Sequence, residues 1–312
     1  MMVAEHRPVM LEETLTALAP GPDDTIVDAT FGGGGHSRRI LKELGDSGRL
    51  VAVDRDPEAA QRSTGLLRDP RFGFVYGAYD KVLWAIADEG RRVDAVLFDL
   101  GLSSFQIDES ARGFSYAREG PLDMRMDSSS GYTAAEFLNA VDAGELARVL
   151  SEYGDVPRGE ARRVAREVVR RRPLRVTTDL YEAVRAAVGW TERGGNPAKR
   201  VFQAVRVRVN DELGGLRRAL EASERLLSPG GRLVVITFHS GEDRLVKRFI
   251  AEREGRCVCP PELPVCVCGA RPVFRRGVVQ RPSERELEEN PRSASARLRA
   301  ASRTAESPGE GA

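Results

Sequence analysis

Residues 25–37 read TIVDATFGGGGHS. The segment 25–30 combines apolar and β-branched residues with one acid, Asp28, which predicts a short buried strand. The four glycines of 32–35 permit positive φ angles and let a ligand approach the backbone closely. The segment 37–44 that follows has apolar residues at helical spacing. A strand, a glycine loop and a helix in this order predict the beginning of an open α/β sheet that binds a ligand at its edge.

The strands predicted outward from this stretch are near-continuous apolar runs at 49–54, 72–76, 93–99 and 232–238. Such runs separated by helices predict a parallel sheet that is covered on both faces. Between the runs at 93–99 and 232–238 lies a long segment with helical patterns and no comparable strand. The predicted organisation is an α/β core in two parts, 1–105 and 210–303, a helical insertion at 106–209, and a disordered tail at 304–312.

The composition limits the classes of protein that remain. The chain has 312 residues, 41% of them hydrophobic, and a net charge of +1. This charge excludes a uniformly basic nucleic-acid binder and leaves room for a local basic face. No apolar run could span a bilayer, and residues 1–8 lack the apolar stretch of a secretory signal. We therefore expect a cytoplasmic protein without a membrane partner.

Four cysteines form one cluster, at Cys257, Cys259, Cys266 and Cys268. Clustering in a chain without a signal indicates a reducing compartment and not a disulfide framework. The spacing is C-x-C, six residues, C-x-C, whereas common zinc knots use two to four residues between paired ligands. Zinc held by four thiolates and four reduced thiols both remain open, and no metal is assigned to the chemistry.

Acidic residues stand at the ends of three predicted strands, at Asp28, Asp54 and Asp99. The carboxyl ends of parallel strands meet at one edge of a sheet, where ligands of open α/β sheets bind. A carboxylate at Asp54 can accept hydrogen bonds from both ribose hydroxyls of an adenosine. One such acid alone would be read as a helix cap, but three with a glycine loop predict a cofactor site. Asp56, followed by Pro57, is better explained as a cap.

Two other nucleotide-binding classes fit this loop poorly. A nicotinamide dehydrogenase should show G-x-G-x-x-G, but the sixth position is Ser37 when counted from Gly32 and Arg38 when counted from Gly33. The G-x-x-x-x-G-K-[ST] phosphate loop of nucleoside triphosphatases is also absent from the sequence.

A series of longer motifs carries a resemblance to a known family. They are DATFGGGGHS at 28–37, VDRDP at 53–57, LFDLGLSS at 97–104, GFS at 113–115, GPLDMRMD at 120–127, FQAVR at 202–206 and FHSGEDR at 238–244. In these motifs and their order, from about residue 6 to 303, the chain resembles the bacterial 16S rRNA (cytosine-N4)-methyltransferase family.

The resemblance implies a class I, Rossmann-like methyltransferase fold with an inserted helical domain that receives the RNA. It implies S-adenosyl-L-methionine as the cofactor and the N4 amine of a cytosine in the decoding region of 16S rRNA as the methyl acceptor, within the small ribosomal subunit. Tyr79 stands where some members have Phe, which keeps an aromatic wall. The cofactor contacts that it implies are Gly34, Gly35, His36, Asp54, Tyr79, Asp99 and Gln106.

The chemistry suggests a role for Asp99. The cytosine N4 lone pair is delocalised into the ring, so alignment of amine, methyl and sulfur should carry much of the catalysis. A carboxylate at Asp99 either orients the amine as a catalytic group or only contacts the cofactor, and both interpretations stay open. His239 could line the base pocket, while Ser240 fits a structural turn. The predicted strand ends hold no Cys, which argues against a covalent adduct at carbon 5.

The segment 158–175 holds eight arginines against Glu160 and Glu167. Its apolar residues form a stripe at helical spacing, at Ala161, Val164, Ala165 and Val168. Most of the arginines then face away from that stripe and predict a phosphate-binding face, with a merely solvated face as the alternative. Two other functions remain: methylation of DNA or another RNA, and a non-catalytic RNA-binding assembly factor. The oligomeric state, and whether free rRNA suffices, stay open.

Overall fold

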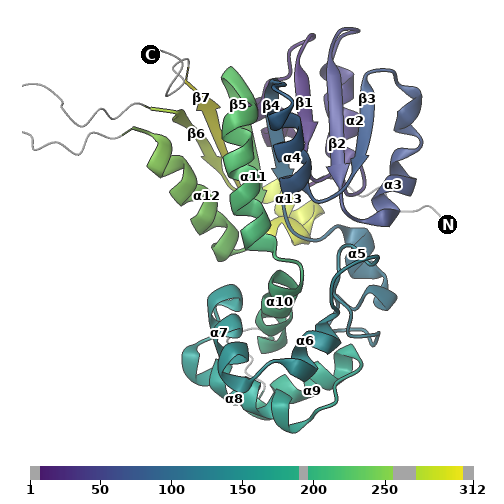
Figure 1. Cartoon of the computed structure of the whole chain (residues 1–312), viewed down its shortest axis with the longest axis vertical. Helices are drawn as coiled ribbons and strands as arrows, with labels where there is room; N and C mark the ends of the chain where they lie inside the picture. The colour runs from purple at the N-terminus through teal and green to yellow at the C-terminus, as the bar shows by residue number, and fades with distance from the viewer. Residues whose placement is uncertain (1–7, 190–195, 256–271, 305–312) are drawn as a thin grey trace, which may run out of the picture. The chain divides into compact units, whose positions relative to one another are not determined.

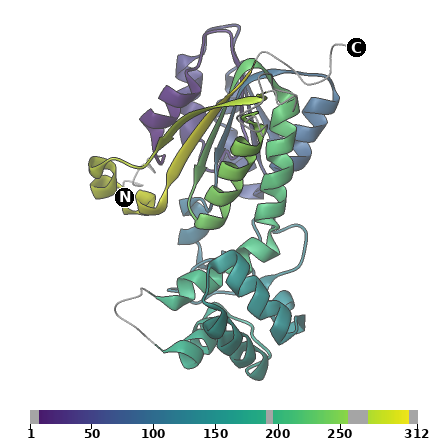
Figure 2. The same ribbon diagram turned by 90° about the vertical axis from the view of Figure 1, so that its left-hand side faces the viewer.

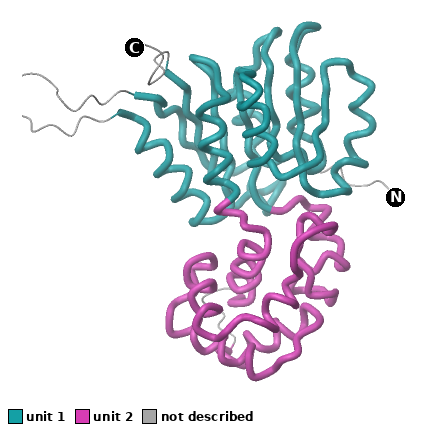
Figure 3. Tube along the Cα trace, viewed as in Figure 1, with its two compact units in different colours: residues 1–101, 215–312 teal, residues 102–214 magenta. Residues whose placement is uncertain are grey.

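The computed structural model describes residues 8–189, 196–255 and 272–304. The chain divides into two compact units, one formed by 1–101 with 215–312 and the other by 102–214 (Figure 3). The cysteine cluster and residues 305–312 lie outside the described residues, so the zinc hypothesis and the disordered tail remain predictions.

The first unit contains a seven-stranded sheet with the order β3-β2-β1-β4-β5-β7-β6 (Figure 1). Strands β1 to β5 are parallel, whereas β7 is antiparallel to β5 and β6 is antiparallel to β7. The bounds are β1 Thr25–Asp28, β2 Arg49–Asp54, β3 Phe72–Tyr76, β4 Val93–Asp99, β5 Leu227–Thr237, β6 Phe274–Gln280 and β7 Arg297–Arg303. The predicted α/β class is confirmed.

Helices cover both faces of this sheet, with α1 and α2 on one face and α11 and α12 on the other (Figure 2). Alternate strand residues serve the two faces: Ile26 packs with the α1 and α2 side, and Val27 with α4, α11 and α12. The helices are α1 Leu11–Leu18, α2 Gly35–Glu43, α3 Pro57–Ser63, α4 Tyr79–Asp88, α11 Glu212–Leu226, α12 Ser240–Arg253 and α13 Glu284–Glu289.

Two strands differ from the sequence prediction. Residues 228–231, predicted as a turn, lie inside β5, where the pairing with β4 jumps from Val93↔Leu227 to Ala95↔Arg232. The strand β7 was not predicted, because its sequence RLRAASR is rich in arginine. Its charge is compensated in part, since the guanidinium groups of Arg297 and Arg299 donate to Asp243 of α12.

The second unit is built from helices around its own apolar core. Its helices are α5 Ser104–Asp108, α6 Ala134–Ala140, α7 Ala143–Gly154, α8 Arg158–Arg170, α9 Thr177–Val188 and α10 Pro197–Val209. Asn210 holds the GPLDMRMD segment in place, accepting from Met126 N at 2.8 Å and donating to the Met124 carbonyl at 2.7 Å. Among the described residues, no helix combines the length and apolar character needed to cross a bilayer.

Candidate cofactor site and RNA-binding face

The glycine loop between β1 and α2 needs glycine for steric reasons. Gly34 caps α2 with φ of 73°, in the left-handed region that other residues avoid. A Cβ at this position would lie 2.6 Å from the Phe31 ring, which is buried. A Cβ at Gly35 would lie 2.2 Å from Pro8. Both glycines are therefore closely packed against side chains, and a larger residue at either position would force Phe31 or Pro8 to shift.

Asp54, at the end of β2, anchors this loop. Its Oδ2 accepts from Gly32 N at 2.7 Å, and its Oδ1 accepts from Asp56 N at 2.9 Å. Burial raises the pKa of the Asp54 carboxyl, against the opposing effect of these hydrogen bonds. Arg62 of α3 also holds the loop, donating to the Gly32 carbonyl at 3.0 Å. The cap predicted at Asp56 is confirmed, because its side chain accepts from Glu58 N at the start of α3.

Asp28 stabilises the loop through buried hydrogen bonds and does not offer its carboxylate to a ligand. Its carboxylate accepts from the Ser37 hydroxyl at 2.6 Å and from Thr30 N at 3.2 Å, and the residue is buried. Burial raises the pKa of this carboxyl. Of the three acids at strand ends, Asp28 therefore has a structural environment.

Asp99, at the end of β4, faces His36 in the first turn of α2. Asp99 Oδ2 lies 3.4 Å from His36 Nε2, and the histidine side chain is only 7% exposed. Asp99 Oδ1 has no hydrogen-bond partner among the described residues. Thr30 fixes the backbone here, since Asp99 N donates to its hydroxyl at 2.6 Å. Burial alone would lower the pKa of His36, but the interactions with Asp99, Asp28 and Glu286 together outweigh it, so this pKa is raised.

The remaining predicted residues lie on other elements. Tyr79 begins α4, and its ring meets Phe98 edge-on with 5.6 Å between centroids. Gln106 belongs to the second unit, where its side-chain oxygen accepts from Ser103 N and closes a capping box on α5. His239 caps α12, with Nδ1 accepting from Gly241 N at 3.2 Å, and Ser240 is the first residue of that helix.

The structure thus brings most of the predicted site together at one edge of the sheet. That edge is where β1 and β4 are neighbours and the strand order reverses, the usual ligand position in such sheets. The residues gathered there are Gly34, Gly35, His36, Asp54, Tyr79 and Asp99. Sequence reasoning did not single out Thr30 or Arg62. For Thr30 the signal was its place in the DATFGGGG motif, whereas nothing local marks Arg62.

These residues fit a cationic adenosyl cofactor. The Asp99 Oδ1 atom offers an acceptor that no described side chain or backbone group fills. Asp54 places a second carboxylate beside the glycine loop. Acceptors of this kind suit ribose hydroxyls and positively charged groups.

The arginine-rich segment forms α8 and the turn that follows it. The predicted apolar stripe is confirmed, since Ala161, Val164, Ala165 and Val168 are buried. Seven of the eight arginines are exposed, namely 158, 162, 163, 166, 170, 171 and 175. Arg172 is the exception, because its guanidinium donates to the carbonyls of Leu138 and Val141. Arg172 therefore stabilises the helical unit and does not belong to the exposed face.

The strand order β3-β2-β1-β4-β5-β7-β6, with β7 antiparallel, and the acids at the strand ends define a class I methyltransferase. The model of the MraW methylase family matches residues 3–304, and the chain belongs to this family. Membership also supports S-adenosylmethionine as the methyl donor.

Several relatives match over nearly their whole length, and each is named ribosomal RNA small subunit methyltransferase H. The protein from Rubrobacter xylanophilus is 75% identical over 98% of both chains. The one from Heliobacterium modesticaldum is 45% identical over 96% of this chain and 99% of its own. A solved rRNA methylase from Streptococcus thermophilus covers 97% of this chain and 99% of its own at 11% identity, with a TM-score of 0.43. That likeness is too low to add to the assignment.

Proposed function

We propose that the protein transfers a methyl group from S-adenosylmethionine to the N4 amine of one cytosine in the decoding region of 16S rRNA, within the small ribosomal subunit. The family and the names of the relatives support a small-subunit rRNA substrate. The observation that carries the choice of an amine is Asp99 Oδ1, an acceptor without a partner among the described residues, at the end of β4. An rRNA substrate is met in the cytoplasm, where we expect the enzyme to act.

In this proposal, the first unit holds the cofactor. Asp54 accepts from the ribose hydroxyls, and the loop at Gly34 and Gly35 lets the cofactor approach the backbone. Tyr79 forms an aromatic wall beside the adenine, and Gln106 contributes from the start of the helical unit. The bound cofactor supplies a methyl group on a positively charged sulfur.

The residues of the chain contribute alignment and electrostatics. An N4 hydrogen donated to the Asp99 carboxylate would orient the amine and concentrate its lone pair on nitrogen. Thr30 holds the backbone of Asp99, and His36 faces its other carboxylate oxygen. With these supports, the carboxylate keeps one orientation, which is what a positioned acceptor requires.

The helical unit receives the RNA in this proposal. The exposed arginines of α8 contact backbone phosphates, and the target base leaves its stack to reach the methyl group. Because phosphate contacts carry no base sequence, the shape of the folded RNA should contribute to selection.

The test is methyl transfer from labelled cofactor to three substrates: purified small subunits from a strain lacking the gene, naked 16S rRNA, and DNA. Label in RNA of the small subunit or in the naked 16S rRNA supports the proposal, and comparing these two identifies the form that is used. Label in DNA alone would overturn it and favour a DNA amino-methyltransferase. Cofactor binding without any transfer would favour a non-catalytic assembly factor.

A further inference from the structure

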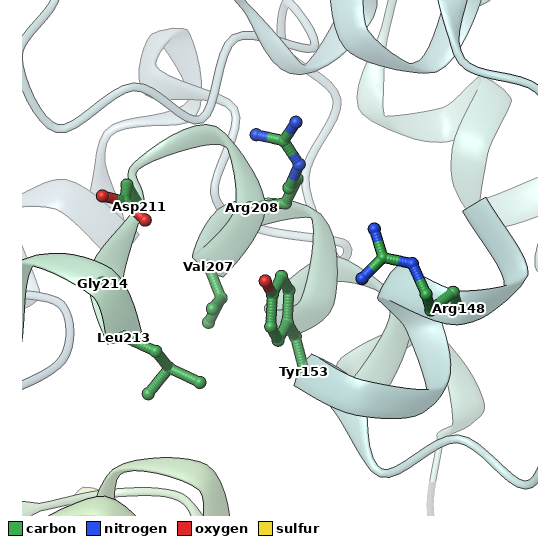
Figure 4. A pocket seen from close by; sticks show the side chains of 7 residues that line it. All are labelled: Arg148, Tyr153, Val207, Arg208, Asp211, Leu213 and Gly214. Carbon is green, nitrogen blue, oxygen red and sulfur yellow. The ribbon is translucent and has the colours of Figure 1, made fainter. Parts of the chain in front are cut away.

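The helical unit contains a pocket of about 270 Å³ (Figure 4). Its apolar wall is formed by the ring of Tyr153 on α7, the side chain of Val207 on α10, and Leu213 near the start of α11. Two guanidinium groups, of Arg148 and Arg208, stand around it. The volume lies near the lower end of small-ligand sites, about 300 Å³, so the pocket suits one flat group of nucleoside size and no double helix.

The charges around the pocket are largely compensated. Glu145 lies 3.9 Å from Arg148 and 3.8 Å from Arg208, and Glu152 pairs with Arg148 at 3.0 Å. Asp211 adds a further carboxylate to the lining. The two arginines therefore offer N–H donors with little net positive charge. This environment disfavours a phosphate group and suits an uncharged ring with a polar edge.

Two of the lining side chains matter for recognition, because one is held in place and the other has an unbonded hydroxyl. Arg208 is fixed by the rings of Tyr132 and Phe137, which lie 5.8 and 5.4 Å from its Cζ atom. The Tyr153 hydroxyl has no hydrogen-bond partner among the described residues. Its ring lines the cavity. An aromatic face beside fixed N–H donors is the arrangement that proteins use to stack an unpaired base and read its edge.

We propose that this pocket holds one unpaired base of the RNA substrate, stacked on Tyr153 with its polar edge toward Arg208. The lining contains none of the residues that form the cofactor site, and we assign the pocket to a second base and not to the methyl acceptor. The inference rests on the proposed function for the choice of RNA.

Occupancy can be measured without methylation. In protein labelled with 3-fluorotyrosine, the ¹⁹F resonance of Tyr153 is the one of six tyrosine signals that Y153F removes. A single-stranded RNA dodecanucleotide of mixed sequence should shift this resonance, and the same strand annealed to its complement should not. An equal shift with the duplex, or no shift with the single strand at saturating concentration, would overturn the inference.

Affinity for 16S rRNA gives the second readout. Y153F retains the ring and should bind as the wild type does, whereas Y153A and Y153L should bind roughly 5- to 150-fold more weakly, the factor that corresponds to about 1–3 kcal/mol for one stacked base. Y153L keeps apolar packing, so equal binding by Y153L and Y153F would reject stacking. A shifted Tyr153 signal in a protein that methylates no rRNA would leave the pocket standing and remove the proposed function.

Discussion

His36 Nε2 and Asp99 Oδ2 lie 3.4 Å apart, at the point where β1 and β4 are neighbours in the sheet. The histidine is almost fully buried, and both of its ring nitrogens lack an ordinary hydrogen bond among the described residues. Asp99, Asp28 and Glu286 all favour its protonated form. The protonation of His36 is thus coupled to the charge of the Asp99 carboxylate, which we place beside the reacting groups.

This pair predicts a pH dependence of stability. Because the pKa of His36 is raised, its stabilising contribution is full below about pH 6.5, the ordinary value, and is lost as the pH rises through the folded-state pKa. Urea unfolding between pH 6 and 9 should show a declining free energy of unfolding for the wild type. The decline should be smaller in Asp99→Asn, where burial acts on His36 with less opposition.

The control for this experiment is His36→Gln, which removes the titrating group. Its free energy of unfolding should vary least over the same pH range. If the wild type, Asp99→Asn and His36→Gln showed the same decline, the pair would have no part in it.

Asp54 gives a prediction about cofactor affinity. Asp54→Asn removes the negative charge that accepts from Gly32 N and from the proposed ribose hydroxyls. A hydrogen bond to a charged group contributes about 1.5–3 kcal/mol, so affinity for S-adenosylmethionine should fall by about one to two powers of ten in calorimetry. Asp56→Asn is the matched control, because Asn caps a helix as well as Asp does, and it should bind the cofactor normally. Equal affinities of the two variants would remove Asp54 from the site.

The exposed arginines of α8 give a prediction about salt dependence. Replacing Arg158, Arg162 and Arg166 with Ala should weaken RNA binding and lower the log–log salt slope by roughly 2 to 3, since each lost phosphate contact lowers it by about 0.7–0.9. Arg172 is left in place because it bonds backbone carbonyls inside the unit.

The control for the arginine face changes the same net charge on the other unit. Arg91, Arg248 and Arg285 are exposed there, and their replacement by Ala should change the slope little. Equal slopes for the two triple variants would mean that the α8 face is only solvated.

The parallel strands could be predicted closely from sequence, because a strand buried on both faces must be apolar along its length. The runs at 49–54, 72–76 and 93–99 coincide with β2, β3 and β4. Strand β7 escaped this reasoning. It lies near the sheet edge, and two of its three arginines, Arg297 and Arg299, pair with Asp243, a partner more than fifty residues away that no local pattern reveals.

The site was predictable to the level of strand ends and not to the level of contacts. Asp28 and Asp54 look alike in sequence, because each ends a predicted strand. In the structure, however, Asp28 accepts a hydrogen bond from the Ser37 hydroxyl, whereas Asp54 lies beside the glycine loop. Likewise, the arginines 170–172 form one run, but only Arg172 turns inward to carbonyls of α6 and the residue that follows it. Such differences depend on side-chain directions, which follow from tertiary packing.

The most direct measurement is nucleoside mass spectrometry of 16S rRNA after incubation of small subunits from a deletion strain with the wild type or with Asp99→Asn. We predict N4-methylcytidine at a single position with the wild type, and a turnover in Asp99→Asn that falls much more than its cofactor affinity, because the Asp99 carboxylate acts on the amine in the transition state. A methyl group on carbon 5 or on ribose would contradict the proposed reaction. A cofactor affinity that falls in step with turnover would make Asp99 a cofactor ligand only.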